Sequence, residues 1–113
     1  MTKFTKLLND LQIDNNFLKQ YMSAKNDEAS DYAKDRMLIE FGKNCKVALS
    51  TLNKIVEDTK FACRKYGESN YPKYQAINSL ACGAACQVFC EMHEAYLAGR
   101  VTDEEWIKFG KNA

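Results

Sequence analysis

The stretch that decides the fold runs from Pro72 to Gly99 and reads PKYQAINSLACGAACQVFCEMHEAYLAG. It predicts one helix, because at 100° per residue its apolar and small side chains fall on two neighbouring stripes that cover about two-thirds of the helix girth. The first stripe comprises Tyr74, Ile77, Ala81, Ala84, Ala85, Val88, Met92, Ala95 and Tyr96, and the second comprises Cys82, Cys86, Cys90, His93 and Leu97. The charged and polar side chains left to face water are Lys73, Gln87, Glu91 and Glu94. A helix with so little polar surface needs neighbours on at least two sides, so we expect it to form the centre of a helical bundle.

A second helical pattern lies earlier in the chain. Apolar and small residues recur there at steps of three and four, at Leu38, Phe41, Cys45, Ala48, Leu52, Ile55, Thr59, Ala62 and Tyr66. The unbroken register predicts one long helix over residues 28–66, with Asn26 or Asp27 as its N-cap. A break at Gly42 is the alternative, because glycine costs about 1 kcal/mol in a helix interior. Together with the helix over 72–98, this segment predicts a long antiparallel helical hairpin.

The N-terminal segment predicts further helices. The helical spacing of its apolar residues predicts helices over about 2–12 and 14–24, with Asp14 capping the second. A single helix with a polar notch is the alternative.

Gly99 is expected to be the C-cap glycine of the helix over 72–98. The C-terminal segment that follows carries the clearest local signal. Thr102 and Glu105 form a capping box in front of a helix expected over about 103–111. A helix this short does not persist alone, so we expect Trp106 and Phe109 to dock it on the bundle.

The whole chain is expected to be one all-α domain spanning residues 1–113. The expected architecture is a compact helical bundle built on the long hairpin, with N-terminal helices and a short C-terminal helix covering it. One proline and five glycines in 113 residues fit that class. Because the seam of residues 28–66 is longer than its hairpin partner, a second chain could pack against it, and we expect a homo-oligomer.

Composition excludes several classes of partner. The chain is 46% apolar and 27% charged, which is ordinary for a soluble globular protein. Its net charge of +1 gives no overall field that attracts nucleic acid or an anionic membrane. The first twelve residues lack the apolar run of a signal peptide, and no run approaches the roughly 20 apolar residues of a membrane span. We therefore expect a cytoplasmic protein that does not associate with membranes.

The cysteines predict packing more than chemistry. Three of the five lie on one predicted helix, where a disulfide between residues four apart is strained, so we interpret them as reduced, buried thiols. Cys86, Cys90 and His93 share one side of that helix and are the candidate metal ligands, with Cys45 or Cys63 completing the set. Structural zinc ligands usually sit on short knuckles beside a loop, which favours the packing interpretation. We expect no cofactor and assign no catalytic residue.

A basic segment that carries tyrosines is the candidate binding site. Residues 43–74 contain seven basic and three acidic side chains, and the excess gathers around one end of the predicted hairpin. The proposed site comprises Lys60, Arg64, Lys65, Tyr66, Tyr71, Lys73 and Tyr74. Cations, aromatic rings and a helix N-terminus could together hold a phosphate, a nucleotide or an acidic patch on a protein. The alternative is a solvated lysine-rich face whose tyrosines cap the core. No glycine-rich phosphate loop and no specific nucleic-acid motif is present in the sequence.

These observations favour a small, non-enzymatic cytosolic protein that acts through protein–protein interaction. A composition rich in Lys, Asn and Tyr is typical of small proteins of AT-rich bacteria and their phages. The concrete form we expect is therefore a regulator or inhibitor of a host protein, encoded by a phage or another mobile element. The alternative is an oligomeric small-ligand binder that holds a nucleotide or another phosphate compound at the basic, tyrosine-bearing corner.

Overall fold

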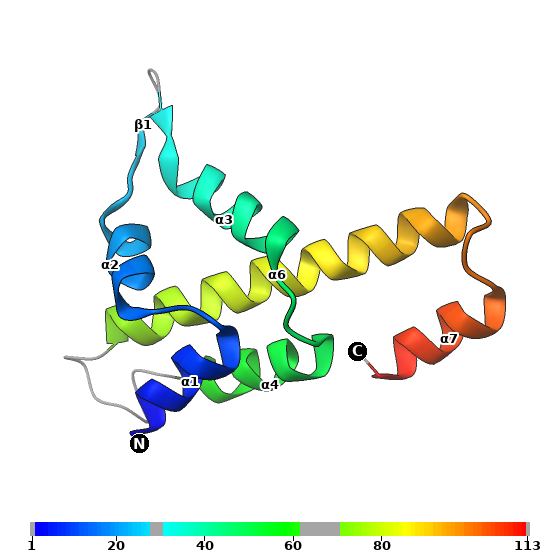
Figure 1. The fold of residues 1–113 in the computed structure, drawn as a ribbon, viewed down its shortest axis with the longest axis horizontal. Helices are drawn as coiled ribbons and strands as arrows, with labels where there is room; N and C mark the ends of the chain where they lie inside the picture. Colours follow the sequence, from blue (N-terminus) through cyan, green and yellow to red (C-terminus); the bar gives the residue numbers. More distant parts are fainter. Residues whose placement is uncertain (1, 28–30, 62–70, 113) are drawn as a thin grey trace.

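Six helices account for most of the residues that the computed structural model describes, which are 2–27, 31–61 and 71–112 (Figure 1). The helices are α1 (Lys3–Leu11), α2 (Asn15–Ser23), α3 (Ala33–Asn44), α4 (Leu49–Thr59), α6 (Tyr71–Leu97) and α7 (Asp103–Asn112). A two-residue antiparallel pair, β1 (Asn26–Asp27) with β2 (Asp31–Tyr32), is the strand structure found in the described residues. The predicted all-α helical bundle is confirmed.

The core forms around the first half of α6, whereas the sequence pattern predicts neighbours along the whole helix. The largest fully buried side chains come from four helices and are Leu11, Leu18, Leu52, Ile55, Ile77 and Leu80. Burial of each such side chain stabilises the fold by about 1.5–3 kcal/mol, which makes this cluster the main source of stability. The buried residues of α6 end at Ala84, and the rest of the helix runs out beyond α4, with α7 folded back beneath it (Figure 1).

The prediction of one long helix over residues 28–66 is wrong. Helix α3 begins at Ala33 and ends at Asn44, and α4 begins at Leu49, so the break falls after Gly42 and not at it. The backbone is extended at Cys45 and Ala48, which turns Val47 into the core. Val47 was not part of the predicted seam, whereas Ala48, which was, is exposed. The sequence between Asn44 and Ala48 contains no proline or glycine that would predict this break.

The break also changes the expected hairpin, because α3 and α4 meet α6 in opposite senses. Near the end of α4, the Asn78 side-chain amide donates hydrogen bonds to the Val56 carbonyl and to Thr59 Oγ1. At the start of α4, Leu49 lines the same hollow as Cys86. Helix α4 therefore runs antiparallel to α6. Helix α3 instead crosses α6 at an angle, and the two helices run in the same general direction from N- to C-terminus (Figure 1). Of the two helices in the segment expected to be one long helix, α4 is therefore the one that runs antiparallel to α6.

Gly42 marks a close approach of two helices. A Cβ added there would lie 3.3 Å from Gln87 Cβ and 3.4 Å from the backbone oxygen of Gly83. A Cβ at Gly83 would lie 2.7 Å from Leu38 Cδ1. The two glycines thus let α3 and α6 pack backbone to backbone, and the helix continues through Gly42 because packing offsets its poor propensity.

Local capping explains the N-terminal elements. Of the two alternatives for this segment, the structure has two helices, and the Phe17 N–H donates to Asp14 Oδ1 at 2.7 Å. Asn26 caps α3 from a distance: its Oδ1 accepts from the Asp35 N–H at 3.2 Å, and its Nδ2 donates to Asp35 Oδ1 at 3.0 Å. The prediction of Asn26 or Asp27 as the N-cap residue is wrong, because the helix begins at Ala33 and its N-cap is Tyr32, which makes no capping hydrogen bond with its side chain.

The C-terminal signals also behave as predicted. Gly99 has a φ of +77°, and the N–H groups of Gly99 and Arg100 donate to the last carbonyls of α6, which is a Schellman motif. The capping box forms, since the Glu105 N–H donates to Thr102 Oγ1 and the Thr102 N–H donates to Glu105 Oε1. Trp106 docks α7, but on the projecting half of α6 and not on the bundle core.

Candidate functional site

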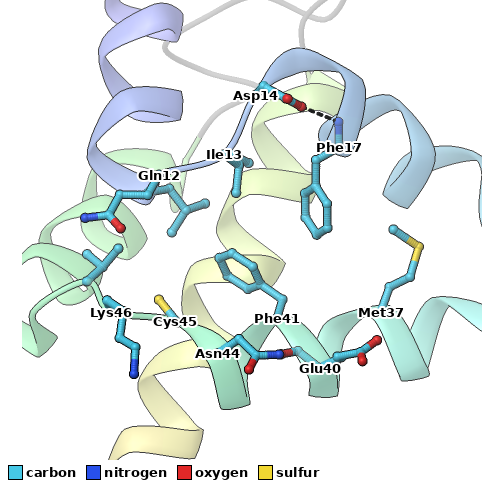
Figure 2. Close-up of a pocket in the computed structure, with 12 residues that line it drawn as sticks. Gln12, Ile13, Asp14, Phe17, Met37, Glu40, Phe41, Asn44, Cys45 and Lys46 are labelled. Carbon is cyan, nitrogen blue, oxygen red and sulfur yellow. Dashed lines mark hydrogen bonds between the residues drawn. The ribbon is translucent and has the colours of Figure 1, made fainter.

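A hollow of about 510 Å³ opens between the α1–α2 turn and the end of α3 (Figure 2). Twelve residues line it: Leu11, Gln12, Ile13, Asp14, Phe17, Met37, Glu40, Phe41, Asn44, Cys45, Lys46 and Val47. We call this hollow the groove. Its size lies within the usual range of about 300–1,000 Å³ for ligand sites. The helix break at 45–48 creates one wall of the groove, because the chain leaves α3 there and turns toward α4.

The floor of the groove is apolar. Phe17 and Phe41 point into it from opposite walls, with ring centroids 5.6 Å apart (Figure 2). Both rings are half-buried, as are Ile13 and Met37. Half-buried aromatic and methionine side chains can still release water from a partner surface, so this floor retains apolar area for binding.

The rim of the groove is polar and exposed. It carries Gln12, Asp14, Glu40, Asn44 and Lys46, all of which face solvent. Asp14 is committed to capping α2, and the Asn44 side-chain amide donates to the Glu40 carbonyl at 2.9 Å. The rim therefore places the ammonium group of Lys46 and the carboxylate of Glu40 around an apolar opening.

The turn at Gln12 carries backbone strain. Gln12 has φ 61° and ψ 39°, the left-handed conformation that glycine usually occupies after a helix. Its N–H donates to the Asn9 carbonyl, and the Ile13 N–H donates to the Leu8 carbonyl, so the turn is a Schellman motif built with a glutamine. A non-glycine residue in this conformation costs about 1–2 kcal/mol. Strain of this kind gathers at functional sites, and here it lies at the groove mouth.

The described residues around the groove form no metal-binding cluster. Across the described residues, no group of three or more His, Cys, Asp or Glu side chains is arranged to hold a metal ion. In the same part of the chain, no buried side-chain nitrogen or oxygen lacks a hydrogen-bond partner. The arrangement can accept an apolar group from outside and surround it with polar contacts.

The predicted basic corner lies only partly within the described residues. Tyr74 is buried at 6% exposure and packs edge-on against Phe4, with ring centroids 5.8 Å apart. The Lys73 ammonium lies 5.5 Å from the same Phe4 ring, so Lys73 and Tyr74 together hold α1 against α6. Lys60 and Tyr71 are exposed. Arg64, Lys65 and Tyr66 lie outside the described residues, and phosphate binding at this corner stays a prediction.

The cysteine stripe is more exposed than the sequence suggests. Cys82 is half-buried, whereas Cys86, Cys90 and His93 face solvent, which corrects the expectation of buried thiols. The reason is that α4 begins at Leu49, beside Cys86, so that α4 does not cover α6 beyond this point. Burial, and secondly the neighbouring Cys86, raises the pKa of the Cys82 thiol above its ordinary value of 9.0. The candidate ligands Cys86, Cys90 and His93 form no metal-binding group in the described structure.

Sequence reasoning missed most of the groove. Phe41 was predicted as part of a helical seam and Asp14 as a helix cap, and neither was assigned to a binding site. One signal was available, since the polar run after Gln12 interrupts the apolar stripe of the N-terminal helices. The second wall of the groove depends on the break after Asn44, where the sequence has no proline or glycine that would predict it.

Comparison with known proteins adds no family to this description. No protein-family model, curated protein or solved structure matches the chain. In the described part of the chain, no helix is both long and apolar enough to cross a membrane.

Proposed function

We propose that this chain is a non-enzymatic protein that binds another protein, which inserts an apolar side chain into the groove. The observation that carries the proposal is the apolar floor of Phe17, Phe41 and Met37, left half-buried at the bottom of an open hollow. Folding alone would favour closing such a floor, because each exposed Å² of apolar surface forfeits about 25 cal/mol.

The chemistry of the groove favours a protein over a small molecule. Small-ligand sites usually place a few convergent polar groups among apolar ones to orient the ligand. The polar groups here lie on the exposed rim, and Asp14 already caps a helix. A rim of mixed charge around an apolar centre is typical of protein interfaces, in which a buried anchor supplies most of the affinity.

The properties of Met37 and Gln12 support the same proposal. Methionine adapts its shape to different partners, and a strained turn at the mouth holds Ile13 toward the opening. In its concrete form, the proposal is a cytoplasmic regulator or inhibitor of a host protein. Composition alone motivates that last step.

A site-specific photo-cross-linker at Asn44 tests the proposal in the native host. A benzophenone amino acid there should cross-link one discrete partner protein, because Asn44 lies on the rim. The same probe at Gln20, exposed on α2 away from the groove, should not. Equal cross-linking from both positions would contradict the groove as the binding site.

A matched pair of variants on α3 measures the contribution of the floor. Met37→Glu places a charge in the floor and should weaken partner binding about tenfold or more, since anchor residues dominate interface energies. Ile39→Glu makes the same kind of change at a side chain that is 53% exposed and outside the groove, and should leave binding unchanged. Circular dichroism confirms that both variants fold. Equal affinity of Met37→Glu and the wild type would reject the proposal.

A further inference from the structure

A second hollow, of about 360 Å³, lies between α2, the start of α3 and the first half of α6. We call it the α6 hollow. It is lined by Tyr21, Met22, Lys34, Pro72, Gln75, Ala76 and Ser79, and it shares no lining residue with the groove. Its volume lies in the range of about 300–1,000 Å³ that is usual for small-ligand sites. The α6 hollow is therefore a separate candidate for binding.

The α6 hollow brings together hydrogen-bonding side chains from three helices. Tyr21 comes from α2, Lys34 from α3, and Gln75 and Ser79 from α6. None of the described residues that line the hollow is an aspartate or a glutamate. One ammonium group among neutral hydrogen-bond donors gives the hollow a positive potential, which favours an anion that accepts hydrogen bonds. The groove differs in this respect, since its polar side chains lie on an exposed rim.

Lys34 is held beside the hollow by the ring of Tyr21. The Lys34 ammonium lies 5.0 Å from the centroid of that ring, and the Lys34 side chain is half-buried. A lysine held in this way has already lost rotamer freedom and part of its hydration. Binding of an anion would therefore require little further ordering of this side chain.

Tyr21 and Ser79 add a hydrogen-bond donor to the same hollow. Tyr21 is 3% exposed. Burial raises the pKa of its phenol above the ordinary value of 10.0, a hydrogen bond with Ser79 partly offsets this, and the charge of Asp35 adds to the increase. Tyr21 is thus a neutral phenol at physiological pH. Two paired hydroxyls use one hydrogen between them, so the second hydrogen is left for an acceptor in the hollow.

The charges around the hollow do not cancel this preference for an anion. Asp35 acts on Tyr21 but does not line the hollow. It is exposed, where solvent screens its charge, and its Oδ1 accepts a hydrogen bond from Asn26 Nδ2 at 3.0 Å. Pro72 lies in the first turn of α6, a helix of 27 residues, where the helix dipole adds a positive potential.

We propose that the α6 hollow binds a small oxyanion, a carboxylate or a phosphate, whose oxygens accept hydrogen bonds from Lys34, Gln75 and the Tyr21–Ser79 pair. Met22 and Ala76, which line the same hollow, would contact the apolar part of an organic anion. The inference does not depend on the proposed function, because different residues line the hollow and the groove.

An NMR titration of the full chain tests the inference. Inorganic phosphate and acetate are added separately, at an ionic strength kept constant with sodium chloride, up to about 20 mM because such small ions have few atoms with which to bind. The backbone amide signals of Ala76 and Ser79 should shift along a saturating curve with at least one of the two ions. The amide of Asn44, on the groove rim, should not shift. Saturation with one ion alone identifies the class of oxyanion that binds.

Two glutamines provide a matched pair of variants. Gln75→Glu places a carboxylate in the hollow and should weaken anion binding about tenfold or more through repulsion of like charges. Gln20→Glu makes the same change on α2 outside the hollow and should leave the binding curve unchanged. Both positions are exposed, so circular dichroism should show unchanged helix content.

Lys34→Met removes the ammonium group but keeps an unbranched side chain over the Tyr21 ring, and it should also weaken binding about tenfold or more. The inference is overturned if neither ion gives saturating shifts at Ala76 and Ser79. It is also overturned if Gln75→Glu and Lys34→Met bind as tightly as the wild type, because the ion would then bind at another place.

Discussion

The contact between Gly42 and Gly83 shows at the scale of single residues how packing overrides propensity. Gly83→Ala adds a methyl group 2.7 Å from Leu38 Cδ1. Overpacking of this kind costs about 1–3 kcal/mol, while alanine gains about 1 kcal/mol of helix propensity over glycine. We expect Gly83→Ala to lower the free energy of unfolding by up to about 2 kcal/mol, as measured by urea denaturation.

Gly110→Ala provides the control on α7, where an added Cβ has no atom within 4 Å. The free energy of unfolding should stay unchanged or rise by up to about 1 kcal/mol. Equal effects of the two substitutions would mean that α3 and α6 do not approach as closely as described.

Gln12 gives a second test at this scale, with the opposite sign. Gln12→Gly removes the strain of a left-handed glutamine and should raise the free energy of unfolding by about 0.5–1 kcal/mol. Gln20→Gly, in the interior of α2, should lower it by about 1 kcal/mol. If Gln12→Gly is stabilising and also weakens partner cross-linking, the strained turn is retained for binding.

At the scale of elements, Tyr96 and Asp103 clasp α7 to α6. The Tyr96 hydroxyl donates to Asp103 Oδ1 at 2.7 Å. That hydrogen bond, and secondly the charge of Asp103, raises the pKa of Tyr96 above its ordinary value of 10.0. Because folding favours the protonated phenol, the contribution is fully present below pH 10 and is lost as the pH rises through the raised pKa.

We therefore expect α7 to undock at alkaline pH, reported by the fluorescence of Trp106, the single tryptophan of the chain. Tyr96→Phe keeps the stacked ring but lacks the hydroxyl, so its fluorescence should not follow this titration. The same alkaline transition in Tyr96→Phe and the wild type would show that another group controls the docking.

At the scale of elements, prediction from the sequence located helix caps but not the break after Asn44. Caps such as Asp14, Gly99 and the Thr102–Glu105 box are short-range signals, and the structure confirms each of them. The break after Asn44 is a tertiary effect, because burial of Val47 wins over a helical register that the local sequence favours. Local chemistry therefore predicted where helices are capped but not where packing interrupts them.

At the scale of the whole molecule, the sequence predicted the class and the central helix but did not predict the groove. The apolar girth of α6 implied burial along its full length, yet its buried residues end at Ala84. The groove depends on three segments that meet only in the folded chain, and periodicity within any one of them cannot reveal it. Tyr74 was placed both on the apolar stripe and in the candidate binding site, and its burial against Phe4 agrees with the stripe.

The crossing of α3 over α6 has an evolutionary consequence. A lineage that gains a methyl group at position 83 must trim the side chain at position 38, and one that enlarges position 42 must accommodate it at position 87. Substitutions at these pairs should arise in concert among descendants of a common ancestor, while position 110 drifts independently. Such paired change would offer a way to recognise distant relatives whose overall similarity has faded.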